Sequence, residues 1–357
     1  MTTPMTTHER MRCMYNHQEA DCVPIIESPW GSTIERWQRE GLPTGADWEA
    51  FFGLDSLVTI GCDNSPQYPA ETLERTEDYT ITTTPFGVTM KNWRHMSGVP
   101  EFLDFTVVDP DSWARAKPRM TPNRNRINWA HLERNYANWR REGKWISAGF
   151  WFGFDVTHSW FVGTDRILIA LLEKPEWVKD MIDTMLALDL AMFEQVWEAG
   201  YHFDEIRWPD DMGYKQAQFF SPNVYREIVK PAHKKAADWA HAKGIKVALH
   251  SCGDINPFLP DILDAGIDML NPLEVKAGMD PLALKERYGD RLALHGGLNA
   301  VLYTEHEALW AEMERLVPQL KVSGGYVLSS DHSVPDSVSL EEFRAFVALA
   351  RRLGMYD

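Results

Sequence analysis

The stretch Phe203-Asp-Glu-Ile-Arg-Trp208, followed by Pro209-Asp210-Asp211, contains the pattern that decides the fold. A short apolar run ends in polar residues, and residues 222–243 then carry apolar side chains at helical spacing until Gly244. This order predicts a strand, a loop, a helix and a helix end. It is the repeating unit of a parallel sheet that is covered by helices.

The same unit recurs four more times towards the C-terminus. The predicted strands and helices are Lys246–His250 with 257–265, Met269–Leu273 with 281–288, Leu292–His295 with a helix from about Glu305, and Gly325–Leu328 with a helix from Leu340. Five consecutive units predict an α/β fold, a (β/α)8 TIM barrel, with residues 1–357 as a single domain. An open doubly wound sheet is the alternative, but no Gly-rich dinucleotide fingerprint follows an early strand.

The first half of the chain is less regular. Val23–Ile26 and Lys144–Ala148 are predicted as barrel strands, and Tyr79–Thr84 with Gly87–Trp93 as a β-hairpin inserted in the N-terminal half.

Composition excludes several classes of function. The formal net charge of −16 disfavours nucleic-acid binding, which needs a basic surface. The N-terminus lacks an apolar signal segment, and no apolar stretch is long enough to span a membrane. The four cysteines show no CxxC spacing. We therefore expect a cytoplasmic enzyme with reduced thiols and no membrane partner.

Polar side chains follow several predicted strands at their C-terminal ends, where the loops of a barrel converge on one active site. These residues are Glu27, Asp210, Asp211, His250, Cys252, Glu274, His295, Asn299, Asp331 and His332. Among the fifteen tryptophans, Trp30, Trp93 and Trp151 are candidates to line the substrate pocket.

His250-Ser251-Cys252 is the most specific of these features, because an extended H-x-C places both side chains on one side of the chain, where one zinc ion can bind both. The alternative is a buried histidine beside an apolar cysteine. Glu274 and His332 are candidates for the remaining ligands. Glu274 could instead form an ion pair with Lys276, and His332 could help Asp331 to anchor a loop.

Asp210 and Asp211 are candidates for a general base. Because adjacent residues rarely point the same way, we expect one to face the pocket and the other to cap the following segment.

Several ordered motifs resemble the uroporphyrinogen decarboxylase superfamily. They are His250-Ser-Cys-Gly-Asp254, Asn271-Pro-Leu-Glu274, Gly278-Met-Asp280, Tyr288-Gly289, Gly296-Gly297-Leu298, Asp331-His-Ser-Val-Pro335 and the opening segment Asn16–Pro24. The resemblance covers nearly the whole chain and implies a barrel. It also implies one of two chemistries, haem-pathway decarboxylation or zinc-dependent methyl transfer with a corrinoid protein, and it suggests a homodimer by analogy.

The methyltransferase branch fits the residues better. The decarboxylase branch carries an Arg-rich segment after the first strand, where this chain has Ile25-Ile-Glu-Ser-Pro-Trp-Gly31. The H-x-C of the methyltransferase branch is present at His250 and Cys252. His332 stands where that branch has a second cysteine ligand and matches a histidine of the decarboxylase branch, and Asn299 stands where many relatives have aspartate.

The resemblance thus implies a zinc-dependent methyltransferase or demethylase that acts on a small substrate, such as a methoxylated aromatic compound, or on a thiol, with a corrinoid protein as methyl partner. Zinc would bind His250, Cys252, Glu274 and His332, while Asp210, Asp211 and His332 handle protons. Substrate would contact Glu27, Trp30, Trp93, Trp151, His295, Asn299 and Asp331. A metal-free decarboxylase using Asp211 and His332 on a small acid is the second interpretation, and a non-enzymatic binding barrel is the third.

Overall fold

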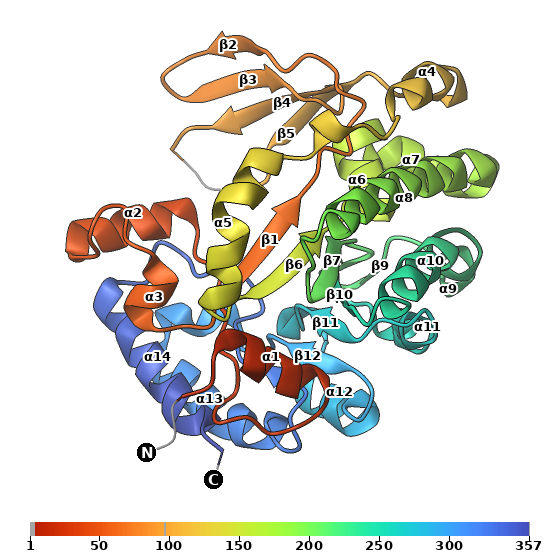
Figure 1. Ribbon diagram of the computed structural model, residues 1–357. Helices are drawn as coiled ribbons and strands as arrows, with labels where there is room; N and C mark the ends of the chain where they lie inside the picture. Colours follow the sequence, from red (N-terminus) through yellow and green to blue (C-terminus); the bar gives the residue numbers. More distant parts are fainter. Residues whose placement is uncertain (1–3, 96–97, 357) are drawn as a thin grey trace.

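Seven parallel strands form the central sheet of the computed structural model, which describes residues 4–95 and 98–356 (Figure 1). In spatial order they are β1 (Leu57–Gly61), β6 (Trp145–Gly149), β7 (Glu205–Pro209), β10 (Lys246–His250), β11 (Met269–Asn271), β12 (Ala293–His295) and β13 (Tyr326–Val327). Most of their residues are apolar and buried on both faces, as is typical of parallel strands between helices and core. The molecule therefore has an α/β fold with a curled parallel sheet.

The segment predicted as the strand Val23–Ile26 forms only isolated bridges. Ile25 pairs in parallel with Leu328, and the amide of Asp55, just before β1, donates to the carbonyl oxygen of Ile25 at 3.1 Å. Pro24 and Pro29 lack an amide hydrogen, which prevents a continuous ladder here. This irregular segment thus lies between the two edge regions of the sheet.

Helices follow the strands and cover the outside of the sheet (Figure 1). The longer ones are α2 (Gly31–Glu40), α5 (Trp129–Arg141), α7 (Thr164–Glu173), α8 (Pro175–Glu198), α10 (Lys230–His241), α13 (His306–Leu320) and α14 (Leu340–Gly354). Shorter ones are α3 (Trp48–Phe52), α4 (Pro110–Ala116), α6 (Phe154–Thr157), α9 (Pro222–Val224), α11 (Leu259–Asp264) and α12 (Pro281–Tyr288). The predicted helix over 222–243 is divided, because a π-helical turn, Tyr225–Val229, separates α9 from α10.

Helix α1 (Thr7–Tyr15) covers the amino ends of the strands. Its Met11, Met14 and Tyr15 are buried against residues that include Trp145 and Met269, the first residues of β6 and β11. Burial of these side chains closes this end of the sheet, which leaves the carboxyl ends of the strands for a site.

A four-stranded antiparallel sheet lies beyond the carboxyl end of β1 (Figure 1, top). Its strands are β2 (Thr72–Arg75), β3 (Tyr79–Thr83), β4 (Val88–Trp93) and β5 (Glu101–Phe105). β3 and β4 pair antiparallel where the sequence predicts a hairpin, with Tyr79 opposite Trp93. The insertion is thus larger than one hairpin. A further small pair, β8 (Gly213–Tyr214) and β9 (Ala217–Gln218), follows β7.

None of the helices in the described ranges is both long and apolar enough to cross a membrane.

Candidate active site

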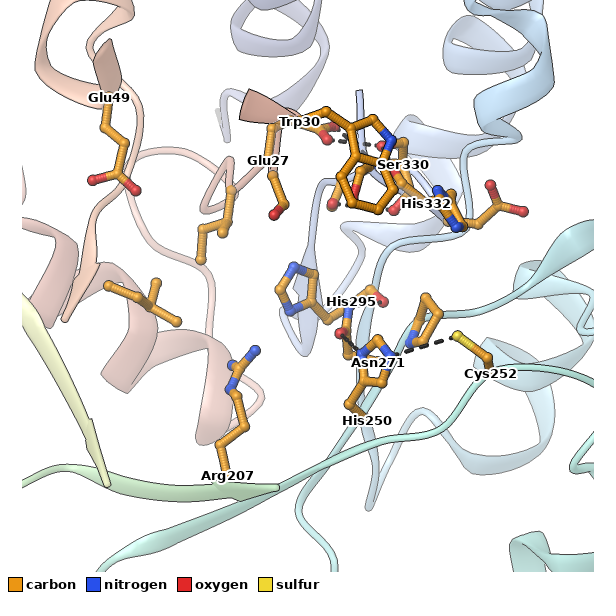
Figure 2. Close-up of a pocket in the computed structure, with 17 residues that line it drawn as sticks. Glu27, Trp30, Glu49, Arg207, His250, Cys252, Asn271, His295, Ser330 and His332 are labelled. Carbon is orange, nitrogen blue, oxygen red and sulfur yellow. Dashed lines mark hydrogen bonds between the residues drawn. The ribbon is translucent and has the colours of Figure 1, made fainter. Parts of the chain in front are cut away.

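A cavity of about 440 Å³ opens at the carboxyl ends of the strands (Figure 2). Strand β7 contributes Arg207, β10 contributes His250, and β12 contributes His295. The polar and charged residues around it come from elements far apart in the sequence: Glu27, Glu49, Arg207, His250, Cys252, Asn271, His295, Ser330, Asp331 and His332. The sequence predicts this convergence, because most of these residues lie at or after the C-terminal ends of predicted strands.

The imidazole of His250 is oriented by Asn271 at the end of the neighbouring strand. His250 Nδ1 lies 2.7 Å from Asn271 Oδ1, while the Nδ2 group of Asn271 donates to the carbonyl oxygen of His295 at 3.3 Å. Because Asn271 presents its oxygen to the ring, Nδ1 carries the hydrogen and donates it. The lone pair of His250 Nε2 is therefore free to bind a cation.

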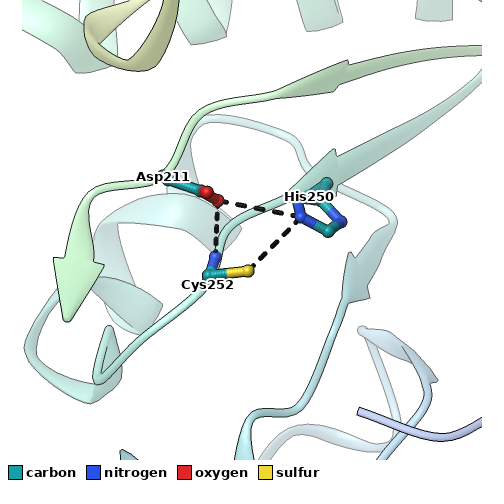
Figure 3. Close-up of side chains that lie close together, drawn as sticks. All are labelled: Asp211, His250 and Cys252. Carbon is teal, nitrogen blue, oxygen red and sulfur yellow. Dashed lines mark hydrogen bonds and ion pairs between the residues drawn. The ribbon is translucent and has the colours of Figure 1, made fainter. Parts of the chain in front are cut away.

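Asp211 and Cys252 lie on the Nε2 side of this ring (Figure 3). Cys252 Sγ is 3.5 Å from His250 Nε2, and Asp211 Oδ1 is 3.7 Å from the same nitrogen. One ligand atom from each residue lies within 4.8 Å of the others. Asp211 Oδ1 also accepts the amide of Cys252 at 2.7 Å, which ties the loop after β10 to the loop after β7.

The loop around Cys252 is held by a glycine that no larger residue can replace without movement. Gly253 has φ of +82°, and a Cβ atom there would lie 2.1 Å from the carbonyl carbon of Gly213. Its amide donates to Glu274 Oε2 at 2.7 Å. Close approach of two backbones thus determines where the thiol lies.

Glu274 and His332 are not close enough to join this donor group. Glu274 accepts the Gly253 amide and its other oxygen is 3.7 Å from Lys276 Nζ, so it supports the loop instead. His332 lies beside Trp30, with ring centroids 5.9 Å apart. In the described residues, Asp211 rather than either of them completes the group with His250 and Cys252.

Glu27 and Ser330 lie on another wall of the cavity (Figure 2). Glu27 is buried and accepts hydrogen bonds from the amide and the hydroxyl of Ser330, both at 2.8 Å. Burial raises the pKa of Glu27 to about 7, although the Ser330 hydrogen bonds oppose this. Asp331 is a loop anchor, because its two oxygens accept the amides of Val275 and Ala300.

Asp210 and Asp211 point in different directions, as the sequence predicts, but neither caps the segment that follows them. Asp210 is completely buried, and its oxygens accept from the amide of Asp155 at 2.7 Å and contact His233 Nε2 at 2.8 Å. It therefore holds the segment after β6 and does not reach the cavity. Asp155, beside both aspartates, has its pKa raised to about 8 by burial and by their negative charge.

Three predicted substrate contacts lie outside the cavity. Trp93 projects from β4 and is 47% exposed beneath Lys91. Trp151 packs against Phe86 and Trp160. Asn299 caps a 3-10 helix by accepting the amide of Val301. Glu27, Trp30, His295, Asp331 and His332 line the cavity.

Arg207 and Asn271 line the cavity but were not among the predicted site residues. Arg207 interrupts the apolar strand Ile206–Trp208. A charge in the middle of such a strand must point to a partner or a cavity. Asn271 is the last residue of its strand, so its position alone could have indicated it.

The donor group fits a zinc ion chemically. One imidazole nitrogen, one thiol and one carboxylate converge, and three protein ligands with an open position are typical of catalytic zinc. Burial, followed by the charges of Asp211 and Glu274, raises the pKa of the Cys252 thiol without metal. A cation among these groups would reverse that shift, because a coordinating thiol is deprotonated.

Comparisons with known proteins agree with this architecture. A search of curated proteins finds no match to the sequence. The solved structure of a methyltransferase from Methanosarcina mazei is similar at 18% identity and a TM-score of 0.64, over 98% of this chain and 99% of that chain. This likeness shows a shared fold. Residues 156–353, more than half of the chain, match the uroporphyrinogen decarboxylase (URO-D) family, and the protein is therefore a member of that family.

Proposed function

We propose that the protein is a zinc-dependent methyltransferase that transfers the methyl group of a small methoxylated aromatic substrate to a corrinoid carried by a partner protein. The observation that carries this proposal is the convergence of Asp211 with His250 and Cys252, the two of these residues that line the cavity. The methyltransferase from Methanosarcina mazei, which shares the fold, supports the choice of reaction class.

Asp211, His250 and Cys252 would hold the zinc ion, and Asn271 would keep His250 Nε2 directed at it. Zinc supplies Lewis acidity, which polarises a bound substrate oxygen. Demethylation of an aryl methyl ether leaves a phenolate oxygen, which takes up one proton. Glu27 is placed to hold such a proton, because it lines the cavity and its pKa of about 7 keeps part of it protonated near neutral pH.

Trp30 and His332 form one wall of the cavity and would contact the substrate from that side. Aromatic side chains in a cavity wall can stack against the ring of an aromatic ligand.

The proposal is tested by methyl transfer from 4-methoxybenzoate to reduced cobalamin, which serves as a soluble substitute for the partner's corrinoid. We expect methylcobalamin and 4-hydroxybenzoate in equal amounts with zinc-loaded protein, and loss of this reaction in Cys252→Ala but not in Cys13→Ala. Cys13 lies on α1 at the opposite end of the strands, so it is a matched cysteine control.

A metal-free decarboxylase acting on a small acid is the second candidate. Arg207 in the cavity favours it, because an arginine there could bind a carboxylate. Release of carbon dioxide from a benzoate by metal-free protein, without methyl transfer, would contradict the first proposal and support this one.

A further inference from the structure

Arg207 extends from β7 into the floor of the cavity (Figure 2). It is the single lysine or arginine among the described residues that line this cavity. Its side chain is 21% exposed. A guanidinium group held in such a place can recognise an anion in a fixed orientation.

The partner of Arg207 is the carboxylate of Glu205, and both of its oxygens already accept hydrogen bonds. Glu205 is completely buried, and its Oε1 accepts Arg207 Nε at 2.8 Å. Its Oε2 accepts the hydroxyl of Tyr15 at 2.5 Å and Trp145 Nε1 at 3.0 Å. Glu205 therefore anchors the guanidinium through Nε and leaves the terminal nitrogens for another partner.

One of those terminal nitrogens is unsatisfied. Arg207 Nη2 is buried and has no hydrogen-bond partner among the described residues. A buried donor without a partner costs free energy, and an anion bound at the exposed part of the guanidinium would offset this cost through attraction to its positive charge.

The carboxylates around the cavity are already engaged elsewhere. Glu27 accepts from Ser330, Glu49 Oε2 accepts the hydroxyl of Ser56 at 2.5 Å, and Asp331 accepts two amides. These side chains thus have other hydrogen-bond partners, and none of them accepts a hydrogen bond from Arg207 Nη2.

The cavity walls also include apolar surface. Ile26, Leu57 and Pro272 line the cavity together with Trp30. Such a surface favours a hydrocarbon or aromatic body between a charged end and a reacting end.

We propose that Arg207 binds the carboxylate of a small aromatic acid, so that the opposite end of its ring faces the zinc ligands. The inference rests on the proposed function and makes it more specific, since it assigns the substrate to the methoxylated aromatic carboxylates.

Binding of benzoate, measured by calorimetry against benzyl alcohol, tests this assignment without any reaction. We expect benzoate to bind at least about tenfold more tightly than benzyl alcohol, because a hydrogen bond to a charged group contributes this much or more. Arg207→Gln should weaken benzoate binding roughly 10- to 100-fold and leave benzyl alcohol unchanged. Lys91→Gln, on β4 and outside the residues that line the cavity, is the control that should bind benzoate normally.

Arg207→Gln leaves Glu205 buried without its cation and could disturb folding. The double variant Glu205→Gln/Arg207→Gln removes both charges and should show the same selective loss of benzoate binding. Equal affinity of the native protein for benzoate and benzyl alcohol, or full benzoate affinity in a folded variant, would overturn the assignment. Benzoate binding without methyl transfer would contradict the proposed function alone, whereas methyl transfer from neutral methoxyarenes without benzoate binding would contradict the assignment alone.

Discussion

The orientation of His250 depends on a single amide side chain. Asn271 accepts from His250 Nδ1 and donates to a backbone carbonyl, so its oxygen is always presented to the ring. We expect Asn271→Ala to lower zinc affinity roughly 10- to 100-fold, as loss of such a partner does at other zinc sites. Competition with a chromogenic chelator measures this. Asn271→Asp, which retains an acceptor, should bind zinc more tightly than Asn271→Ala, and equal loss in both would contradict the orienting role.

Burial of Glu27 should make folding stability depend on pH. Its pKa rises from the ordinary 4.5 to about 7, so the folded protein keeps a proton that the unfolded chain releases between these values. The contribution is present in full below pH 4.5 and is lost as pH rises to about 7, on the order of 3 kcal/mol. Glu27→Gln should lose this part of the slope when the free energy of unfolding in urea is measured from pH 4.5 to 7.5. An unchanged slope would show that Glu27 is not protonated in the folded state.

Residue types at the site could be predicted from the sequence better than their partners. His250, Cys252 and Asp211 lie at or just after strand ends and come close together, because the carboxyl ends of the parallel strands converge on one site. Trp93 was predicted to line the pocket but lies outside the cavity, because an aromatic residue type does not indicate which way its side chain points from the strand. Glu274 was predicted as a metal ligand, but its bond to the Gly253 amide depends on a loop conformation that no local pattern indicates.

The loop after β10 is the element on which the site depends most directly. Gly253 and Gly278 both have φ near +85°, but a Cβ at Gly253 would collide with the backbone of Gly213, and a Cβ at Gly278 would meet no atom within 4 Å. We expect Gly253→Ala to cost roughly 1–3 kcal/mol more stability than Gly278→Ala and to abolish zinc binding. Thermal unfolding and metal content of both variants measure this, and equal effects would mean that backbone crowding is unimportant.

The inserted four-stranded sheet contributes none of the described residues that line the cavity. Trp93 on β4 is exposed outside the cavity, and Trp30 at the start of α2 lines it. Trp30→Ala should weaken benzoate binding several-fold because a stacked aromatic contact contributes about 0.5–1.5 kcal/mol. Trp93→Ala should leave it unchanged in the same calorimetric titration. The reverse order of effects would place the ligand against the insertion.

Strand and helix patterns predicted the second half of the molecule closely. The helix expected over 281–288 is α12, and the strand Lys246–His250 is β10. Strand β1 was missed, because Leu57–Gly61 is short, partly exposed and followed by the insertion instead of a helix. Boundaries in the first half depend on contacts with distant segments, such as Ile25 with Leu328, which a local pattern does not contain.

In the whole molecule, α1 covers the amino ends of the curled parallel sheet, so the carboxyl ends of the strands remain open. Three potential zinc ligands converge there, at the ends of β7 and β10. Zinc content of the purified protein, measured by elemental analysis beside Cys252→Ala, His250→Ala and Cys13→Ala, tests this most directly. We predict about one zinc per chain in the native protein and in Cys13→Ala, and a large loss in the other two. Native protein without zinc after zinc loading, or full zinc retained by Cys252→Ala, would contradict the metal site.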